Sequence, residues 1–178
     1  FFRESYDAQQ ILTELAQSVR TSTSSRELLE TVAVRIQQAL HVKNVTIFLR
    51  DAQHQLLRSE ISFDYDLVAK KSKLITRDDS IPTNSFFVAK LRSSPHPLTI
   101  DDENLLLFET EKDLLQALNT ELLLPLNGKD NLLGAISLSS RIGDLPYSGE
   151  DERLLMSVAD QTTLALENTK LIAQKIEL

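Results

Sequence analysis

The stretch Glu121–Ser139 constrains the fold of this chain most strongly, and it reads ELLLPLNGKDNLLGAISLS. Leucine or isoleucine alternates with other residues in both halves, as expected for two half-buried β-strands. Asn127 and Gly128 stand between the halves, and both residue types tolerate a positive φ in a tight turn. The sequence therefore predicts an antiparallel hairpin at the centre of a sheet. Its buried face is expected to carry Leu122, Leu124, Leu126, Leu132, Gly134, Ile136 and Leu138.

Proline and glycine add detail to this hairpin. Pro125 has no N–H to donate to a strand ladder, so we expect it to face an unpaired edge or a bulge. Gly134 indicates a place where two backbones approach closely. After the hairpin, Tyr147–Asp151 (YSGED) is typical of a helix start, because a serine can cap the helix and acidic residues suit its first turn. That helix is expected to run to the end of the chain.

The composition is that of an ordinary globular domain: 178 residues, of which 42% are hydrophobic and 25% charged. The net charge of −7 gives no basic footprint for nucleic acid. The absence of cysteine excludes disulfides, thiolate metal sites and cysteine nucleophiles, and it fits a reducing, cytoplasmic compartment. No apolar run has the length of a membrane span. The chain begins without methionine and stops inside a helical pattern, so we expect a fragment of a longer protein.

The rest of the chain supplies further helices and a second hairpin. Apolar residues at helical spacing alternate with short segments rich in β-branched residues. Helices are expected over about residues 5–20, 24–40, 85–92 and 103–118, and strands over 44–50, 57–63 and 98–100.

The chain contains, in this order, the segments Leu28–Asp51, Ser93–Asp102, Leu122–Ser140 and Tyr147–Asn168. Together they resemble a GAF domain, the sensory module of phytochromes, cyclic-nucleotide phosphodiesterases and bacterial sensor kinases. The resemblance implies an α+β fold, GAF-like and related to PAS domains. Its antiparallel six-stranded sheet would carry the terminal helices on one face and short helices over the other. It also implies an N-terminal signalling helix at 1–22, a GAF domain at 23–168 and a C-terminal linker helix at 169–178.

In such a fold the middle segment closes over the sheet and forms a ligand pocket. Aromatic and aliphatic walls there would suit a small organic molecule. The same side chains could equally fill the core and leave no pocket. The candidate pocket residues are Phe86, Phe87, Leu91, Leu107 and Phe108.

The last helix carries apolar and small residues at heptad spacing, which is typical of helix pairing. This stripe predicts a homodimer formed through the terminal helices, with packing inside one chain as the alternative. A second stripe holds Leu154, Leu164 and Leu171. The candidate dimer interface holds Leu155, Val158, Thr162, Ala165, Thr169, Ile172 and Ile176.

Several chemistries known for GAF domains do not fit these residues. Covalent bilin attachment and free methionine sulfoxide reduction both use cysteine, which this chain lacks. The cyclic-nucleotide motif is only half matched, by Tyr147 and the pair Asp151–Glu152, and these also suit an ordinary helix start. Haem would need an axial ligand such as histidine. His41, His54 and His96 are instead expected at the surface, and no two of them have metal-ligand spacing.

We therefore expect a non-catalytic sensory domain of a bacterial signal-transduction protein. The whole protein could be a sensor histidine kinase or a related phosphatase or cyclase regulator, whose output domain lies outside this chain. An unidentified small molecule would bind and shift the packing of the terminal helices in a dimer. No cofactor, metal, nucleic acid or membrane contact is expected for these residues. The alternative is a ligand-free structural module that dimerises and spaces its neighbours.

Overall fold

The computed structural model describes residues 2–19, 24–100 and 109–177, with the side chains of 7–19, 24–100 and 109–169. The described elements are α1 (Phe2–Ser18), α2 (Ser25–Leu40), β1 (Asn44–Asp51), β2 (Leu56–Asp66), β3 (Lys71–Ile75), β4 (Ser80–Pro82), α3 (Phe86–Ser93), β5 (Leu98–Thr99), α4 (Glu109–Ala117), β6 (Thr120–Asn127), β7 (Leu132–Ser139), the 3₁₀-helix η2 (Ile142–Asp144) and α5 (Gly149–Glu177).

One antiparallel sheet organises the domain, with strand order β3-β2-β1-β7-β6-β5. The described residues form seven strands rather than the expected six, because the short β4 also pairs with β2. Strand β2 is eleven residues long, so its outer edge accommodates both β3 and β4. Ser80–Pro82 is too short to show any alternation in the sequence, and only its partner strand makes it a strand.

The predicted hairpin is present as β6 and β7, and β7 lies next to β1 inside the sheet. On the outer side of β6, strand β5 pairs only with Leu122 and Leu123. Pro125 is therefore unpaired on that side among the described residues, as its missing N–H requires.

Two details of the hairpin differ from the prediction. The register shifts where Leu126 faces Gly134 but Asn127 faces Leu132, and this bulge turns Leu132 to the opposite face of the sheet. Asn127 and Gly128 also lack the positive φ values expected of the turn. Tertiary contacts of this turn, described below, account for both residue types.

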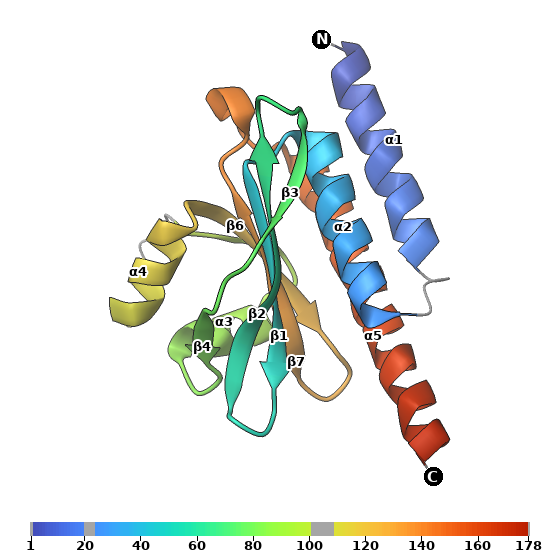
Figure 1. Ribbon diagram of the computed structural model, residues 1–178, viewed down its shortest axis with the longest axis vertical. Helices are drawn as coiled ribbons and strands as arrows, with labels where there is room; N and C mark the ends of the chain where they lie inside the picture. The colour runs from blue at the N-terminus through green and yellow to red at the C-terminus, as the bar shows by residue number, and fades with distance from the viewer. Residues whose placement is uncertain (1, 20–23, 101–108, 178) are drawn as a thin grey trace.

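Helices cover both faces of the sheet, which confirms the GAF-like architecture (Figure 1). Helices α1, α2 and α5 lie on one face, over a core that includes Ile36, Val45 and Ile136. Helices α3 and α4 lie on the other face, over a second, smaller core. The sheet thus separates the terminal helices from the segment that was expected to hold a ligand.

Candidate functional site

The smaller core between the sheet and helices α3 and α4 is where a ligand was expected. Its apolar side chains come from both layers and are buried. Phe48 and Ala135 belong to the sheet, Phe87 and Leu91 to α3, and Leu115 to α4. The described part of this layer is therefore closely packed.

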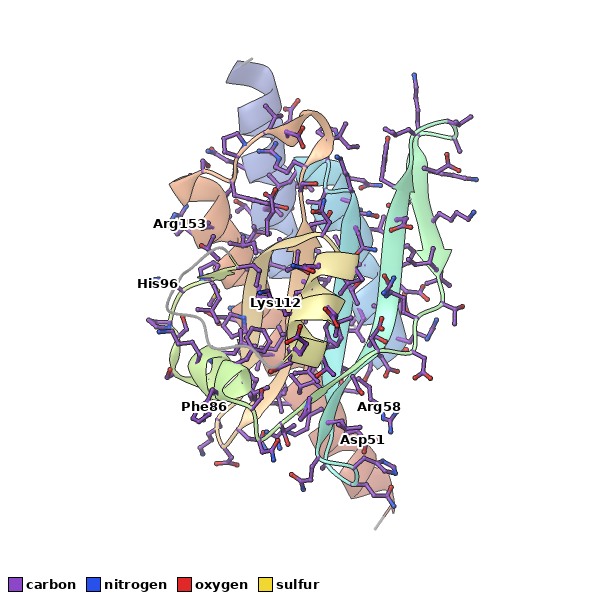
Figure 2. All side chains as sticks on the ribbon, turned by 90° about the vertical axis from the view of Figure 1, so that its left-hand side faces the viewer. Asp51, Arg58, Phe86, His96, Lys112 and Arg153 are labelled. Carbon is purple, nitrogen blue, oxygen red and sulfur yellow. The ribbon has the colours of Figure 1, made fainter. Side chains whose placement is uncertain are left out.

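The structure brings only some of the predicted pocket residues together. Phe87 and Leu91, four residues apart, share the buried face of α3. Phe86 is 70% exposed and lies on the outer side of the helix (Figure 2), so it does not form part of a buried pocket wall as predicted. Successive helical residues point about 100° apart, so Phe86 and Phe87 cannot both face the sheet. Leu107 and Phe108 lie outside the described residues.

The same sheet face also carries buried polar side chains that the sequence analysis did not select. Asn44 Nδ2 donates to Ser62 Oγ at 3.2 Å, and Thr46 Oγ1 donates to Asn44 Oδ1 at 2.8 Å. The Thr46 and Ser62 oxygens lie 2.7 Å apart, and Ser62 must donate there because Thr46 already uses its proton. These three side chains close a ring of hydrogen bonds.

A second polar group on this face is not closed in that way. Thr120 Oγ1 and Ser137 Oγ lie 2.8 Å apart and share one hydrogen bond. Both side chains are buried, and each hydroxyl carries one proton. One of the two protons therefore remains without an acceptor among the described residues. We call Thr120 and Ser137 the hydroxyl pair.

Cavities flank this polar face at the ends of the strands. One, of about 330 Å³, is lined by Asn44, Asp64, Leu118, Asn119 and Ser139, among others. Another, of about 530 Å³, is lined by Thr99, Ile100, Thr120, Glu121 and Tyr147, among others. Thr120, one member of the hydroxyl pair, thus borders space that a small polar molecule could enter.

A sequence signal for the polar face did exist. Thr46, Ser62 and Ser137 alternate with apolar residues in the segments VTI, ISF and ISL. Such a strand is expected to turn its hydroxyls to water. The structure instead buries them, because the layer that contains α3 and α4 covers this second face of the sheet.

The predicted dimer interface is divided by the fold. Leu155, Val158, Thr162 and Ala165 are buried inside the chain, where α1, α2 and the sheet pack on α5. These four positions therefore serve the intramolecular alternative in this structure. Thr169 is half-buried, and the side chains of Ile172 and Ile176 are not described. Of the second stripe, Leu154 is buried and Leu164 is 54% exposed.

The start of α5 is held by reciprocal capping. Ser148 N donates to Asp151 Oδ2 at 2.9 Å, and Asp151 N donates to Ser148 Oγ at 3.0 Å. Arg141 Nη1 lies 3.7 Å from the same Asp151 carboxylate. Asp151 therefore caps the helix, and this accounts for the half-matched nucleotide motif.

Tyr147 connects this helix start to the sheet. Its hydroxyl donates to Ser139 O at 2.6 Å. Burial raises the pKa of Tyr147 well above its usual range, and the negative charge of Glu121 adds to the effect. Tyr147 is therefore neutral and acts as a structural donor at ordinary pH.

In the described part of the chain, no group of three or more potential side-chain ligands is placed to hold a metal ion. Within residues 2–19, 24–100 and 109–177, no helix combines the length and apolar character needed to cross a bilayer. His41, His54 and His96 are exposed, and the His54 ring lies 2.8 Å from the Asp51 carboxylate.

Comparison with known proteins identifies the fold independently. The model of the GAF domain family matches residues 24–166. A search of curated proteins finds no match.

Among solved structures, the chain is similar to the GAF domain of a phosphoenolpyruvate-protein phosphotransferase from Coxiella burnetii (13% identity, TM-score 0.67, covering 96% of this chain and 98% of that one). It is also similar to the GAF domain of a two-component sensor histidine kinase from Bacillus halodurans (18%, 0.59, 85% and 99%). A third similar structure is free methionine-R-sulfoxide reductase from Neisseria meningitidis with its substrate (12%, 0.65, 94% and 93%). At these identities the likeness is one of fold.

Proposed function

This chain belongs to the GAF domain family of sensory domains, and we propose that it is the non-catalytic, cytoplasmic sensory domain of a bacterial sensor histidine kinase. In this proposal a small molecule binds between the sheet and helices α3 and α4. Binding changes how these helices pack, and the change reaches the terminal helices of a dimer. A ligand can shift this equilibrium only by binding one arrangement better than the other.

The hydroxyl pair is the observation that supports ligand binding. An unsatisfied buried donor costs about 1–3 kcal/mol, and a ligand acceptor placed at Thr120 and Ser137 would remove that cost. The apolar side chains around the pair would contact the rest of the molecule. We therefore expect a small, uncharged ligand with at least one hydrogen-bond acceptor and an apolar part.

Native mass spectrometry of the freshly purified protein tests this proposal. We expect an additional small mass on the wild type that is lost from the double variant Thr120→Val/Ser137→Ala. The matched control is Ser157→Ala, a half-buried serine on α5, which should keep the mass. Retention of the mass by the double variant would refute the role of the hydroxyl pair.

Dimer formation is the second part of the proposal. The seam would lie on the part of α5 from Thr169 onward, since the earlier stripe is buried within the chain. Ile172→Asp should raise the dimer dissociation constant at least about tenfold, because it places a charge in an apolar seam. Gln174→Asp, which lies off the heptad stripe, is the control. An unchanged dissociation constant for Ile172→Asp in analytical ultracentrifugation would show that the seam is wrong.

A ligand-free spacer domain is the second candidate function. The closed ring of Asn44, Thr46 and Ser62 favours it, because those polar groups satisfy one another without a ligand. A dimer that carries no additional mass would support the spacer. In that case the variant Thr120→Val/Ser137→Ala should be as stable as the wild type or more so, because replacing both partners of a buried hydrogen bond can be neutral.

A further inference from the structure

We propose that the turn of the β6–β7 hairpin, residues 127–131, couples α3 to α5 around the end of the sheet. Arg92 on α3 and Glu167 on α5 are the positioning residues at its two ends. The inference rests on the proposed function, because it states how a change at α3 reaches the terminal helix. It adds a route that does not pass through the strand ladder.

The connection from α3 to the turn consists of several hydrogen bonds. Arg92 Nη1 donates to Asn127 Oδ1 at 3.1 Å and to Gly128 O at 3.0 Å. Its Nη2 donates to Lys129 O at 3.5 Å. In the other direction, Asn127 Nδ2 donates to Leu91 O at 3.3 Å. The fork of one guanidinium thus holds three consecutive residues of the turn to α3.

The connection from the turn to α5 has fewer hydrogen bonds than the connection to α3. Lys129 N donates to Glu167 Oε2 at 3.5 Å. A Cβ added to Gly128 would lie 3.1 Å from the Leu133 side chain and 3.4 Å from Glu167 Cδ. The turn therefore contacts α5 through the Glu167 side chain, and glycine allows this close approach.

The turn lies where its contacts can connect α3 to α5. Helices α3 and α5 lie on opposite faces of the sheet, and the hairpin turn lies at the sheet end between them (Figure 1). A groove of about 330 Å³, lined by Asn127, Asp160, Leu164 and others, separates part of the turn from α5. The turn is thus fixed to α3 and has room to move against α5. A displacement of α3 moves the turn, and the turn changes the environment of Glu167.

Hydrogen exchange of the whole chain, measured by mass spectrometry without any ligand, tests the coupling. Arg92→Ala should speed amide exchange in residues 160–169 of α5 by about threefold or more, while residues 151–158 stay unchanged. The matched control is Lys90→Ala, on the same helix, since the Lys90 side chain makes no hydrogen bond or ion pair with the described residues. Lys90→Ala should leave both parts of α5 unchanged.

Coupling between two sites is reciprocal, so a change at Glu167 on α5 should also be detected in α3. A purely local role of Glu167 would leave hydrogen exchange in α3 unchanged. If the two ends are coupled, Glu167→Gln should alter exchange in α3, residues 86–93. The effects of Arg92→Ala and Glu167→Gln should also be non-additive in the double variant.

Three outcomes would overturn the coupling: an effect of Arg92→Ala confined to α3 and the turn, a uniform acceleration along all of α5, or strict additivity. Because the experiment uses no ligand, it is independent of whether a small molecule binds. The coupling can hold in a ligand-free spacer, and it can fail in a domain that does bind.

Discussion

Gly134 of β7 is the position where one added carbon should damage the fold most. It lies opposite Leu49 of β1 on one side and Leu126 of β6 on the other. A Cβ built there would lie 2.0 Å from Phe48 O and 3.0 Å from Phe48 C. Both atoms belong to the backbone of β1, so no side-chain rotation can relieve the contact. Even Gly134→Ala should therefore be destabilising.

The structure sets the size of the effect. Ordinary contact begins at 3.4 Å, so β1 and β7 must separate by about 1.4 Å at this point. An inter-strand hydrogen bond of about 2.9 Å does not survive such a stretch. Two ladder hydrogen bonds at about 0.5–1.5 kcal/mol each, with overpacking strain of about 1–3 kcal/mol, give a loss of about 4 kcal/mol. A folded domain has only about 5–15 kcal/mol in total.

Thermal unfolding followed by circular dichroism measures this loss. For a chain of this size, about 4 kcal/mol corresponds to a fall in Tm of about 8–16 °C. The matched control is Gly149→Ala at the start of α5, where an added Cβ meets no atom within 4 Å. That change should be neutral or stabilise by up to about 1 kcal/mol. A Tm for Gly134→Ala within 2 °C or so of the wild type would refute the close approach of β1 and β7.

Other changes test the electrostatics and capping. Tyr147 should stay protonated above pH 10 in the folded state, so its contribution to stability is complete below the unfolded pKa and is lost as the pH rises through the folded pKa. Tyr147→Phe should remove the deprotonation of Tyr147 at high pH from the absorbance titration. The same variant should lower the stability by about 1 kcal/mol, because the hydrogen bond to Ser139 is lost. Arg58, with a smaller effect of His54, holds the pKa of Asp51 at about 2 (Figure 2), so this contribution is present above the unfolded value and lost as pH falls toward 2. Arg58→Ala should raise the Asp51 pKa toward 3.8 in an NMR titration. Ser148→Ala should lower the stability in urea by about 1 kcal/mol, through loss of the α5 cap.

Local sequence patterns predicted the main elements well. The alternation around Asn127 and Gly128 predicted the β6–β7 hairpin, and the capping residues at Ser148 predicted the start of α5. The order of elements predicted the GAF fold, which the family match confirms. These features depend on residues a few positions apart, whose periodicity follows directly from helix and strand geometry.

The candidate site was predicted poorly for a physical reason. Phe86 and Phe87 are the same residue type, and only the orientation of α3 on the sheet decides which of them is buried. Thr120 and Ser137 are adjacent only because β6 and β7 pair in one particular register. Their burial depends further on the α3–α4 layer above them.

The sequence by itself thus determined the main helices and strands, the hairpin and the family. The tertiary structure decided which polar groups are buried, which half of the α5 stripe packs inside the chain, and that Arg92 reaches the hairpin turn. Helix and strand periodicity is a property of a short segment and can be read from it. The packing of α1 and α2 on α5 and the contact from α3 to the turn join residues distant in sequence, and only the packed chain brings them together.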